Sequence, residues 1–481
     1  MRRSHPSFRF ARDRAVSTCR HGDHAILFHA DTGREKIINA SAFWIWKKLD
    51  GRFSLEEVVR EMSAEFDTDA VETVSDDVRA FLDELLREGF IETTDESAVG
   101  PGPRDYVEIS DRPGDFDISL TGKCNLHCEY CFYANEMHGR PDLATAEWFT
   151  FFDELGELGV RNLTLSGGEV FVRRDLWEII DYLVEKRMRY SILSNGTLIT
   201  EDTLKQFEKG KRKSRLNSIQ VSIDGSCPEV HDKSRGKGSF NRAVNGLHLL
   251  KDAKLPVTSR VTINRHNVGD LENIARLLLE DVGLPGFGTN DAIPMGAGCD
   301  NQAGITLSPQ QQLQAILKMH ELDRKYPGRI NASAGPLAKW RMYGEMEHAR
   351  ATGEKPTRWQ MGKLTACGCF YNKLAVHHDG ILSPCNMLAG LELGRINRDP
   401  IKTIWKTHPI LQAMKDRRRI PMNQVPGCED CEWTPYCNGS CPGLAHTMTG
   451  DFNMANPHDC YRDFLKDTGL TSATVPWSKA E

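Results

Sequence analysis

Short apolar runs that favour β-structure alternate with amphipathic helical patterns between residues 117 and 291. The β-rich runs fall at 163–165, 190–193, 219–223 and 257–263. A strand and helix that repeat in this way predict a parallel sheet covered by helices. We therefore expect an α/β domain in this part of the chain.

A different pattern occupies residues 24–92. Two β-rich runs at 25–28 and 36–39 are separated by a turn signal, which predicts a hairpin. Three amphipathic helical segments follow, and residues 54–57 form a capping-box sequence at the start of the second. A hairpin with three helices predicts a winged-helix-like domain.

Charge argues against DNA binding by this domain. Between Glu56 and Glu92 there are thirteen acidic residues and three arginines. Such a surface repels phosphate and cannot release its counterions. Another ligand is therefore expected for the winged-helix-like domain.

Composition narrows the class of protein further. The 481 residues are long enough for two or three domains, 40% are apolar and 27% are charged, and the net charge is -6. These values favour neither nucleic acid nor a membrane as a partner. The first twenty residues contain six arginines and no apolar signal-peptide core, which predicts a loose basic arm. The chain has fourteen cysteines and no secretion signal, which predicts reduced, metal-binding thiols in the cytoplasm.

Three cysteines, Cys124, Cys128 and Cys131, follow the first strand of the α/β domain with gaps of three and two residues. A four-iron cluster normally takes four cysteine ligands, so three would leave one iron open to a small molecule. A closed zinc site is the alternative, with His127 or His138 as its fourth ligand.

This cysteine loop resembles the signature of the radical S-adenosylmethionine (SAM) superfamily. The resemblance implies a partial (β/α)6 barrel, in which SAM binds the open iron and is cleaved to a 5′-deoxyadenosyl radical that abstracts hydrogen from carbon. It also implies SAM contacts at the ends of successive strands. The residues that match these contacts are Gly167, Gly168, Glu169, Ser194, Asn195, Ser222, Asp224, Arg235 and Arg260.

Asp232 follows the fourth strand at a place where a base acting on the substrate would lie. A solvated loop carboxylate is the alternative. We retain Asp232 as the candidate catalytic residue.

The C-terminal part contains a second set of cysteines in a specific order. Its members are Cys367, Cys369, Cys385, Cys428, Cys431, Cys437, Cys441 and Cys460. The order resembles the SPASM extension of radical SAM enzymes that modify peptides. That resemblance implies one auxiliary cluster on Cys369, Cys385 and Cys441, with Cys367 as a possible fourth ligand. It implies a second cluster on the other four cysteines.

The winged-helix-like domain is similar to the small chaperone of pyrroloquinoline-quinone biosynthesis, the prototype of peptide-recognition elements. The similarity extends from Asn39 to Ile91. It implies that the leader of a ribosomally made precursor peptide binds as an added strand beside the hairpin.

The predicted fold class is α/β, with a winged-helix-like domain before the radical SAM barrel and a SPASM domain after it. The predicted segments are a basic arm (1–23), a leader-recognition domain (24–95), a linker (96–115), the barrel (116–325), a bridging segment with the SPASM domain (326–465) and a tail (466–481).

The predicted function is radical modification of a precursor peptide or small protein subunit. The product would be an intrapeptide thioether crosslink, as in maturases of a quinohemoprotein amine dehydrogenase or in sactipeptide synthases. The implied cofactors are SAM and three [4Fe-4S] clusters, and an external one-electron reductant is required. The alternatives are a sulfatase-maturase-like serine or cysteine dehydrogenase, a carbon–carbon crosslinking enzyme and, outside catalysis, a zinc-bearing peptide-binding adaptor.

Overall fold

A computed structural model describes residues 9–13, 16–21, 24–29, 35–65, 71–94, 112–137, 139–331, 334–354, 361–365, 367 and 369–479. The chain divides into two compact units, Met1–Arg112 and Pro113–Glu481. No helix in the described parts of either unit is long and apolar enough to cross a membrane. His138, one alternative zinc ligand, and most of the predicted linker lie outside the described residues.

In its described residues, the first unit has two antiparallel three-stranded sheets and three helices. One sheet has the order β5-β1-β6 and the other β2-β3-β4. The elements are β1 (Arg9–Arg12), β2 (Val16–His21), β3 (His24–His29), β4 (Glu35–Asn39), α1 (Ala40–Lys48), β5 (Asp50–Ser54), α2 (Leu55–Glu65), α3 (Val71–Glu88) and β6 (Ile91–Thr94).

Local chemistry explains where the helices of this unit begin. The Asn39 side chain accepts a hydrogen bond from the Ala42 N–H at 2.9 Å and caps α1. The Ser54 N–H donates to the Glu57 carboxylate at 2.8 Å, while the Glu57 N–H donates to the Ser54 hydroxyl at 3.3 Å. These two bonds are the capping box predicted at the start of α2. The predicted hairpin is also present, as the antiparallel pair β3 and β4.

The prediction of a loose N-terminal arm is wrong for the strands that the structure describes there. β1 pairs with both β5 and β6, and β2 pairs with β3. Phe10 is completely buried in the core of the unit. The six arginines suggested a solvated segment, but strand pairing and the burial of Phe10 hold the described residues 9–12 and 16–21 in sheets.

In the second unit, ten strands of the described residues form one sheet of order β13-β12-β11-β10-β9-β8-β7-β14-β15-β16. From β14 through β7 to β13, neighbouring strands pair in parallel, so the predicted parallel sheet is confirmed. The strands are β7 (Asp115–Ser119), β8 (Asn162–Ser166), β9 (Arg189–Ser194), β10 (Leu216–Ser222), β11 (Val257–Ile263), β12 (Phe287–Asp291), β13 (Ile330–Asn331), β14 (Lys373–Val376), β15 (Ile381–Ser383) and β16 (Gly394–Arg395).

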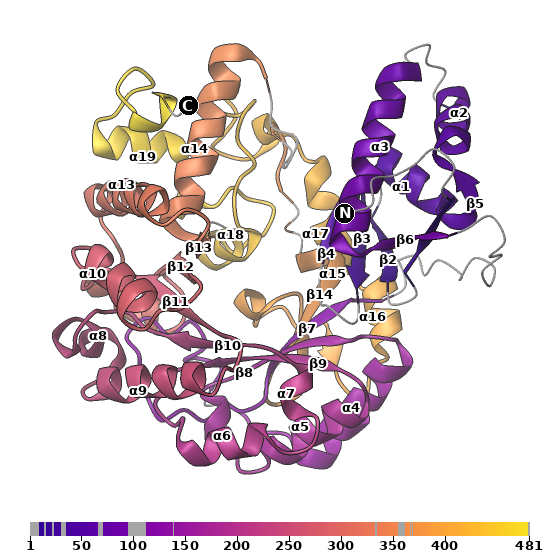
Figure 1. Cartoon of the computed structure of the whole chain (residues 1–481). Coiled ribbons are helices and arrows are strands. Elements are labelled where there is room, and N and C mark those ends of the chain that lie inside the picture. The colour runs from indigo at the N-terminus through magenta and orange to yellow at the C-terminus, as the bar shows by residue number, and fades with distance from the viewer. Residues whose placement is uncertain are drawn as a thin grey trace. The chain divides into compact units, whose positions relative to one another are not determined.

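Helices cover one face of the parallel strands (Figure 1). The helices before β13 are α4 (Thr145–Glu157), α5 (Leu176–Glu185), α6 (Glu201–Phe207), α7 (Arg212–Arg215), α8 (Pro228–Arg235), α9 (Ser239–Asp252), α10 (Leu271–Arg276), α11 (Ala297–Asp300), α12 (Gln302–Ile305) and α13 (Pro309–Lys325). Some of these helices pack directly on the sheet: α5 contacts β9, and its buried apolar residues are Leu176, Ile179, Ile180 and Leu183. The opposite face of the strands is left for the polar residues discussed below.

The C-terminal segment is joined to the barrel through the same sheet. β14 pairs in parallel with β7, and the hairpin strands β15 and β16 continue the sheet beyond it. The helices of this segment are α14 (Gly335–Thr352), α15 (Cys369–Asn372), α16 (Ile401–Thr407), α17 (Pro409–Asp416), α18 (Pro442–Thr449) and α19 (Tyr461–Thr468). The backbone connection therefore holds the segments around Cys369 and Cys385, which flank β14 and β15, near the first strand of the barrel.

Candidate active site

The three cysteines predicted to bind the first cluster lie on one loop after β7. Cys124, Cys128 and Cys131 are each half-buried. The Cys131 N–H donates to the Cys128 carbonyl at 3.2 Å, which forms a tight turn. The Ala297 N–H donates to the Cys131 carbonyl at 3.0 Å and ties the loop to α11. The loop is thus held by a segment far away in the sequence.

Without a metal, the surroundings of these thiols favour their neutral form. Burial raises the pKa of all three thiols, and that of Cys128 to about 12. The Arg235 charge acts in the opposite direction on the pKa of Cys128 and Cys131. A cysteine binds metal as the thiolate, so positive charge from iron would be needed to hold these residues deprotonated.

Two glycines allow the next strand end to lie against the cysteine loop. A Cβ atom at Gly168 would lie 2.3 Å from the Lys123 carbonyl oxygen and 3.0 Å from Cys124 Cβ. At Gly167, where φ is +139°, a Cβ would lie 2.4 Å from the Thr121 carbonyl oxygen. Side chains at these positions would push the loop away, so the glycines are required for this close approach.

Glu169 is almost completely buried beside these glycines, at 1% exposure. Its carboxylate accepts hydrogen bonds from the Ser194 hydroxyl at 2.9 Å, the Asn195 N–H at 2.7 Å and the Phe171 N–H at 3.2 Å. Burial raises the pKa of Glu169, and these hydrogen bonds act against that shift. The carboxylate therefore joins the ends of β8 and β9, and its contact with SAM stays a prediction.

An amide pair connects the end of β9 to the cysteine loop. The Asn195 Nδ2 donates to Asn125 Oδ1 at 2.9 Å, and the Asn125 Nδ2 donates to the Thr197 hydroxyl at 2.8 Å. Asn125 and Thr197 were not among the predicted site residues. Only position could have indicated such a role in the sequence, because Asn125 directly follows Cys124, the first cysteine of the loop.

Asp224 has no exposed surface and lies at the centre of a polar cluster. It forms an ion pair with Arg235 through Nε, accepts a hydrogen bond from the Tyr130 hydroxyl, and accepts another from the Thr262 N–H at 2.7 Å. Tyr130 belongs to the cysteine loop, and the Arg235 guanidinium lies 5.5 Å from the centre of its ring. Arg235 was predicted to contact SAM, and in this structure its Nε forms an ion pair with Asp224.

Replacing Asp224 with asparagine should destabilise the second unit by about 3–5 kcal/mol, because it leaves the buried Arg235 without its counter-ion. Chemical unfolding monitored by circular dichroism measures this change. Asp202→Asn is the matched control, since it breaks the exposed pair with Lys205 and should leave stability unchanged. Equal stability of both variants would show that the buried pair does not organise this site.

Asp232 lies where the sequence predicted it, after β10, but its carboxylate caps the next helix. It accepts hydrogen bonds from the Gly238 N–H at 2.6 Å, the Phe240 N–H at 2.8 Å and the Ser239 hydroxyl at 3.0 Å. Burial raises the pKa of Asp232, but these bonds outweigh it and the net shift is downward. The structure thus favours capping of α9 over proton abstraction by this residue.

Four cysteines predicted to hold the second auxiliary cluster line one cavity. They are Cys428, Cys431, Cys437 and Cys460. Apolar and polar side chains complete the wall, among them Trp433, Met422 and Asp459. In the part of the chain that the structure describes, no three His, Cys, Asp or Glu side chains converge closely enough to hold a single metal ion. The four thiols fit a group that fills the cavity between them.

The cysteines predicted for the first auxiliary cluster also gather in one region. Cys367 and Cys385 pack against the buried side chains of Phe370, Leu388 and Met414. Burial raises the pKa of Cys385, and the charges of Cys441 and Cys367 raise it further. The side chain of Cys369 lies outside the described residues. Participation of Cys367 as a fourth ligand stays a prediction.

Two buried cations near these cysteines were not predicted from the sequence. Arg417 has no exposed surface and donates to the carbonyl groups of Thr365, Phe452 and Met454. Lys339 of α14 forms ion pairs at 2.9 Å with both Asp291 and Asp459. Isolated charged residues carry no pattern, so only the tertiary structure reveals these positions.

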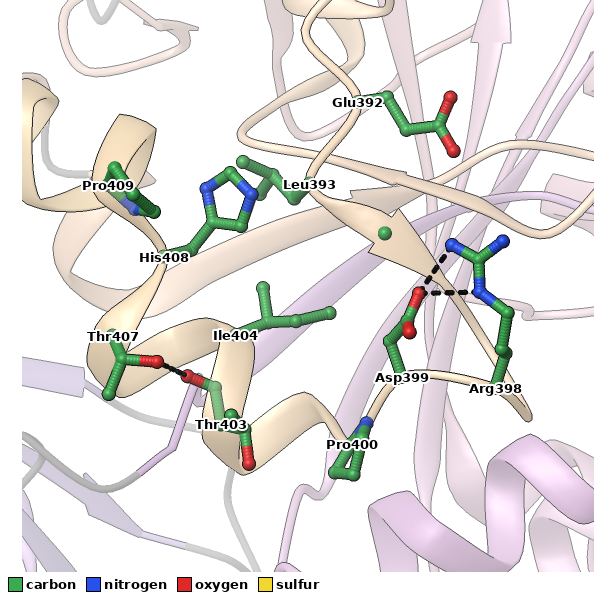
Figure 2. A pocket seen from close by; sticks show the side chains of 11 residues that line it. Glu392, Leu393, Arg398, Asp399, Pro400, Thr403, Ile404, Thr407, His408 and Pro409 are labelled. Atoms are coloured by element: carbon green, nitrogen blue, oxygen red, sulfur yellow. Dashed lines mark hydrogen bonds and ion pairs between the residues drawn. The ribbon is translucent and has the colours of Figure 1, made fainter.

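A further hollow lies beside β16 and α16, and none of the predicted site residues lines it (Figure 2). The Arg398 guanidinium forms an ion pair with Asp399 at 2.6 Å there, and the Thr407 hydroxyl donates to the Thr403 carbonyl at 2.9 Å. The polar groups of both pairs therefore have their ion-pair or hydrogen-bond partners within the wall of the hollow.

Three family models match successive parts of the chain. The Coenzyme PQQ synthesis protein D (PqqD) model matches residues 24–91, the Radical SAM superfamily model matches residues 118–278, and the model of an iron-sulfur cluster-binding domain, SPASM, matches residues 367–432. The chain is therefore a radical SAM enzyme that carries a PqqD-like domain and a SPASM domain. The predicted class, a radical SAM/SPASM peptide maturase with a fused PqqD-like domain, is confirmed.

The curated relatives of the chain include a heme synthase, a bacteriocin biosynthesis protein and a peptide cyclase. An AdoMet-dependent heme synthase of Methanosarcina barkeri is 27% identical over 74% of this chain and 99% of its own length. The antilisterial bacteriocin subtilosin biosynthesis protein AlbA of Bacillus subtilis is 23% identical over 84% of this chain and 83% of its own. A PqqA peptide cyclase of Granulibacter bethesdensis is 27% identical over 70% and 84%.

The fold is shared with a solved peptide-bound structure. SuiB of Streptococcus suis bound to its precursor peptide SuiA has a TM-score of 0.59 and 11% sequence identity, covering 94% of this chain and all of SuiB. At this identity the similarity concerns the fold. The predicted α/β radical SAM fold class is confirmed.

Proposed function

We propose that this enzyme installs an intrapeptide thioether crosslink in a ribosomally made precursor peptide. Bound SAM and its cluster would supply a 5′-deoxyadenosyl radical, which takes hydrogen from a side-chain carbon. The carbon–sulfur bond would form as the cysteine thiol of the peptide loses its proton, and an auxiliary cluster held by Cys428, Cys431, Cys437 and Cys460 would supply an acceptor for the one remaining electron.

The cysteine loop packed against Gly167 and Gly168 carries this proposal. It places three thiols at the carboxyl ends of the parallel strands, where the buried Glu169 and the Asp224–Arg235 pair organise the surrounding loops. Ser222 ends β10 at the same rim. These residues would hold SAM in position, and the burial of the site would exclude water.

The first unit would recognise the leader of the peptide. In the sheet of order β2-β3-β4, the central strand β3 is paired on both sides. The edge strands, to which a further strand can be added, are therefore β2 and β4. On β4 the apolar side chain of Ile37 is 70% exposed, which is high for an isoleucine. An extended leader segment that pairs with β4 would cover this side chain.

The C-terminal cysteines would hold two auxiliary [4Fe-4S] clusters, for a total of three. An external one-electron reductant would supply electrons in the cytoplasm. The cavity lined by Cys428, Cys431, Cys437 and Cys460 supports the second of these clusters.

Mass spectrometry of a cysteine-bearing candidate peptide tests the proposal. Incubated anaerobically with iron-loaded enzyme, SAM and reductant, the peptide should lose two hydrogen atoms per crosslink, and its cysteine should resist alkylation. A serine or cysteine dehydrogenase would instead leave an aldehyde that a hydrazine probe captures. An unchanged peptide mass beside active SAM cleavage would contradict peptide modification for that candidate.

The similarity to heme synthases favours a second candidate function, radical modification of a porphyrin. That similarity spans almost the whole length of the relative. Incubation with an iron porphyrin under the same conditions distinguishes the two functions, since only one substrate class should change in mass.

A further inference from the structure

A row of residues crosses four strands on the face of the barrel sheet that points away from the helices. Ser222 is paired with Arg260, Arg260 with Gly288, and Gly288 with Asn331. Paired residues on neighbouring strands point to the same face, and the preceding residue on a strand points to the other. The preceding residue on β10, Val221, faces the helix layer, since a Cβ at Gly196 would contact both Val221 and Ala243 of α9.

Arg260 is a partly buried cation without a counter-ion on this inner face. Its Nε donates to Gln220 Oε1 at 3.2 Å and its Nη1 to the Thr289 carbonyl at 3.3 Å. Among the described residues no carboxylate forms an ion pair with it, and burial lowers its pKa. Burying a guanidinium without an opposite charge is unfavourable, so this position suits an anionic ligand.

The guanidinium lines a hollow of about 360 Å³ beside the beginnings of β12 and β13. A second arginine, Arg329, lies in the same wall and donates to the carbonyls of Leu279 and Leu284. The rest of the lining is neutral, with polar groups from Gln220 and Thr258 and no acidic residue. The wall therefore carries two positive charges and no negative one.

Gly288 leaves room for the guanidinium in this hollow. A Cβ atom there would lie 3.1 Å from Arg260 Cζ and 3.2 Å from Nη1. Any larger residue at 288 would shift the guanidinium. The position of the guanidinium in the hollow thus depends on residues 260 and 288, which are paired on the neighbouring strands β11 and β12.

We propose that Arg260 anchors a carboxylate of the precursor peptide, either an acidic side chain or its C-terminus, in this hollow. The planar guanidinium has donors left for a forked contact with two oxygens. This role of Arg260 rests on the proposed function, because a precursor peptide would be the source of the carboxylate that binds in the barrel. It gives Arg260 a role in substrate specificity in place of the predicted contact with SAM.

Ligand binding to the full-length, iron-loaded enzyme tests this role. The probes are acetyl-glutamyl amide as the carboxylate and inorganic phosphate as the free anion, each titrated by saturation-transfer NMR. The variants are Arg260→Gln and Gly288→Ala. Arg276→Gln is the control, since it removes the same charge from an exposed position on α10. Unfolding temperatures show whether each variant remains folded.

We expect the carboxylate probe to bind the parent enzyme and Arg276→Gln equally, and Arg260→Gln at least about tenfold more weakly, as for loss of a charged hydrogen bond. Gly288→Ala should weaken binding as well, by displacing the guanidinium without removing its charge. Equal affinity for Arg260→Gln, binding of phosphate alone, or no binding to the parent enzyme would overturn the proposal. A weaker SAM affinity of Arg260→Gln with unchanged probe binding would also overturn it, and would assign the residue to SAM.

These results are separate from a test of the proposed function. Deoxyadenosine formation by the parent enzyme reports on the radical chemistry, whereas probe binding reports on the hollow. Probe binding without deoxyadenosine would contradict the proposed function and leave the anion site in place.

Discussion

Replacing Cys124, Cys128 and Cys131 together with alanine will abolish SAM cleavage and lower the iron content by about four atoms per chain. The three thiols lie on the loop that packs against Gly168, so the triple variant removes every cysteine of that loop. Deoxyadenosine measured by liquid chromatography and iron measured by emission spectroscopy give the two values. The remaining iron should belong to the auxiliary clusters, because their ligands lie elsewhere in the chain.

Cys299→Ala is the control for this experiment. Cys299 is exposed and belongs to none of the predicted ligand sets. Its replacement should change neither iron content nor deoxyadenosine formation. Persistent SAM cleavage in the triple variant would show that the cluster that cleaves SAM has other ligands.

Deleting residues 1–112 will reduce modification of the full-length peptide by about 10²-fold or more while SAM cleavage without peptide continues. The first unit has its own core, and binding of the leader to it would raise the local concentration of the peptide at the active site. Initial rates of peptide modification and of deoxyadenosine formation separate the two effects. Adding residues 1–112 as a separate chain should restore only part of the rate, because the tether is lost.

A single substitution refines this prediction. Ile37→Asp places a charge on the exposed apolar position of β4 and should weaken leader binding, measured by fluorescence anisotropy of a labelled leader. Leu317→Asp is the matched control at an exposed apolar position of α13, and it should bind the leader normally. Normal binding by Ile37→Asp would place the leader elsewhere on the unit. An unchanged rate for the deletion would remove leader recognition from the first unit altogether.

Motif spacing was the most reliable guide in the sequence. The four C-terminal cysteines Cys428, Cys431, Cys437 and Cys460 are spread over 33 residues, yet they line one cavity. The parallel sheet and the capping box at Ser54 were also predictable, because strand periodicity and helix caps depend on neighbouring residues. The N-terminal arm was misjudged because its charges conceal two short strands: β1 pairs with the distant strands β5 and β6, and β2 pairs with the adjacent strand β3.

Roles of charged residues were harder to predict than metal ligands. Asp224 and Arg235 both matched expected SAM contacts, and the structure pairs them with each other. Asp232 lies at the expected place but caps α9. A carboxylate has the same appearance in a sequence whether it binds a ligand, pairs with a cation or caps a helix, and only its neighbours in space distinguish these uses.

The sequence by itself determined the class of enzyme, since cysteine spacing and strand periodicity are local properties that a single chain displays directly. The tertiary structure decided which polar groups meet. It joined β14 to β7, placed Lys339 between Asp291 and Asp459, and gave Arg260 on the inner face of the sheet no counter-ion among the described residues. These contacts join residues up to about 260 positions apart, and the energy of a buried charge depends on what surrounds it in space and not on its neighbours along the chain.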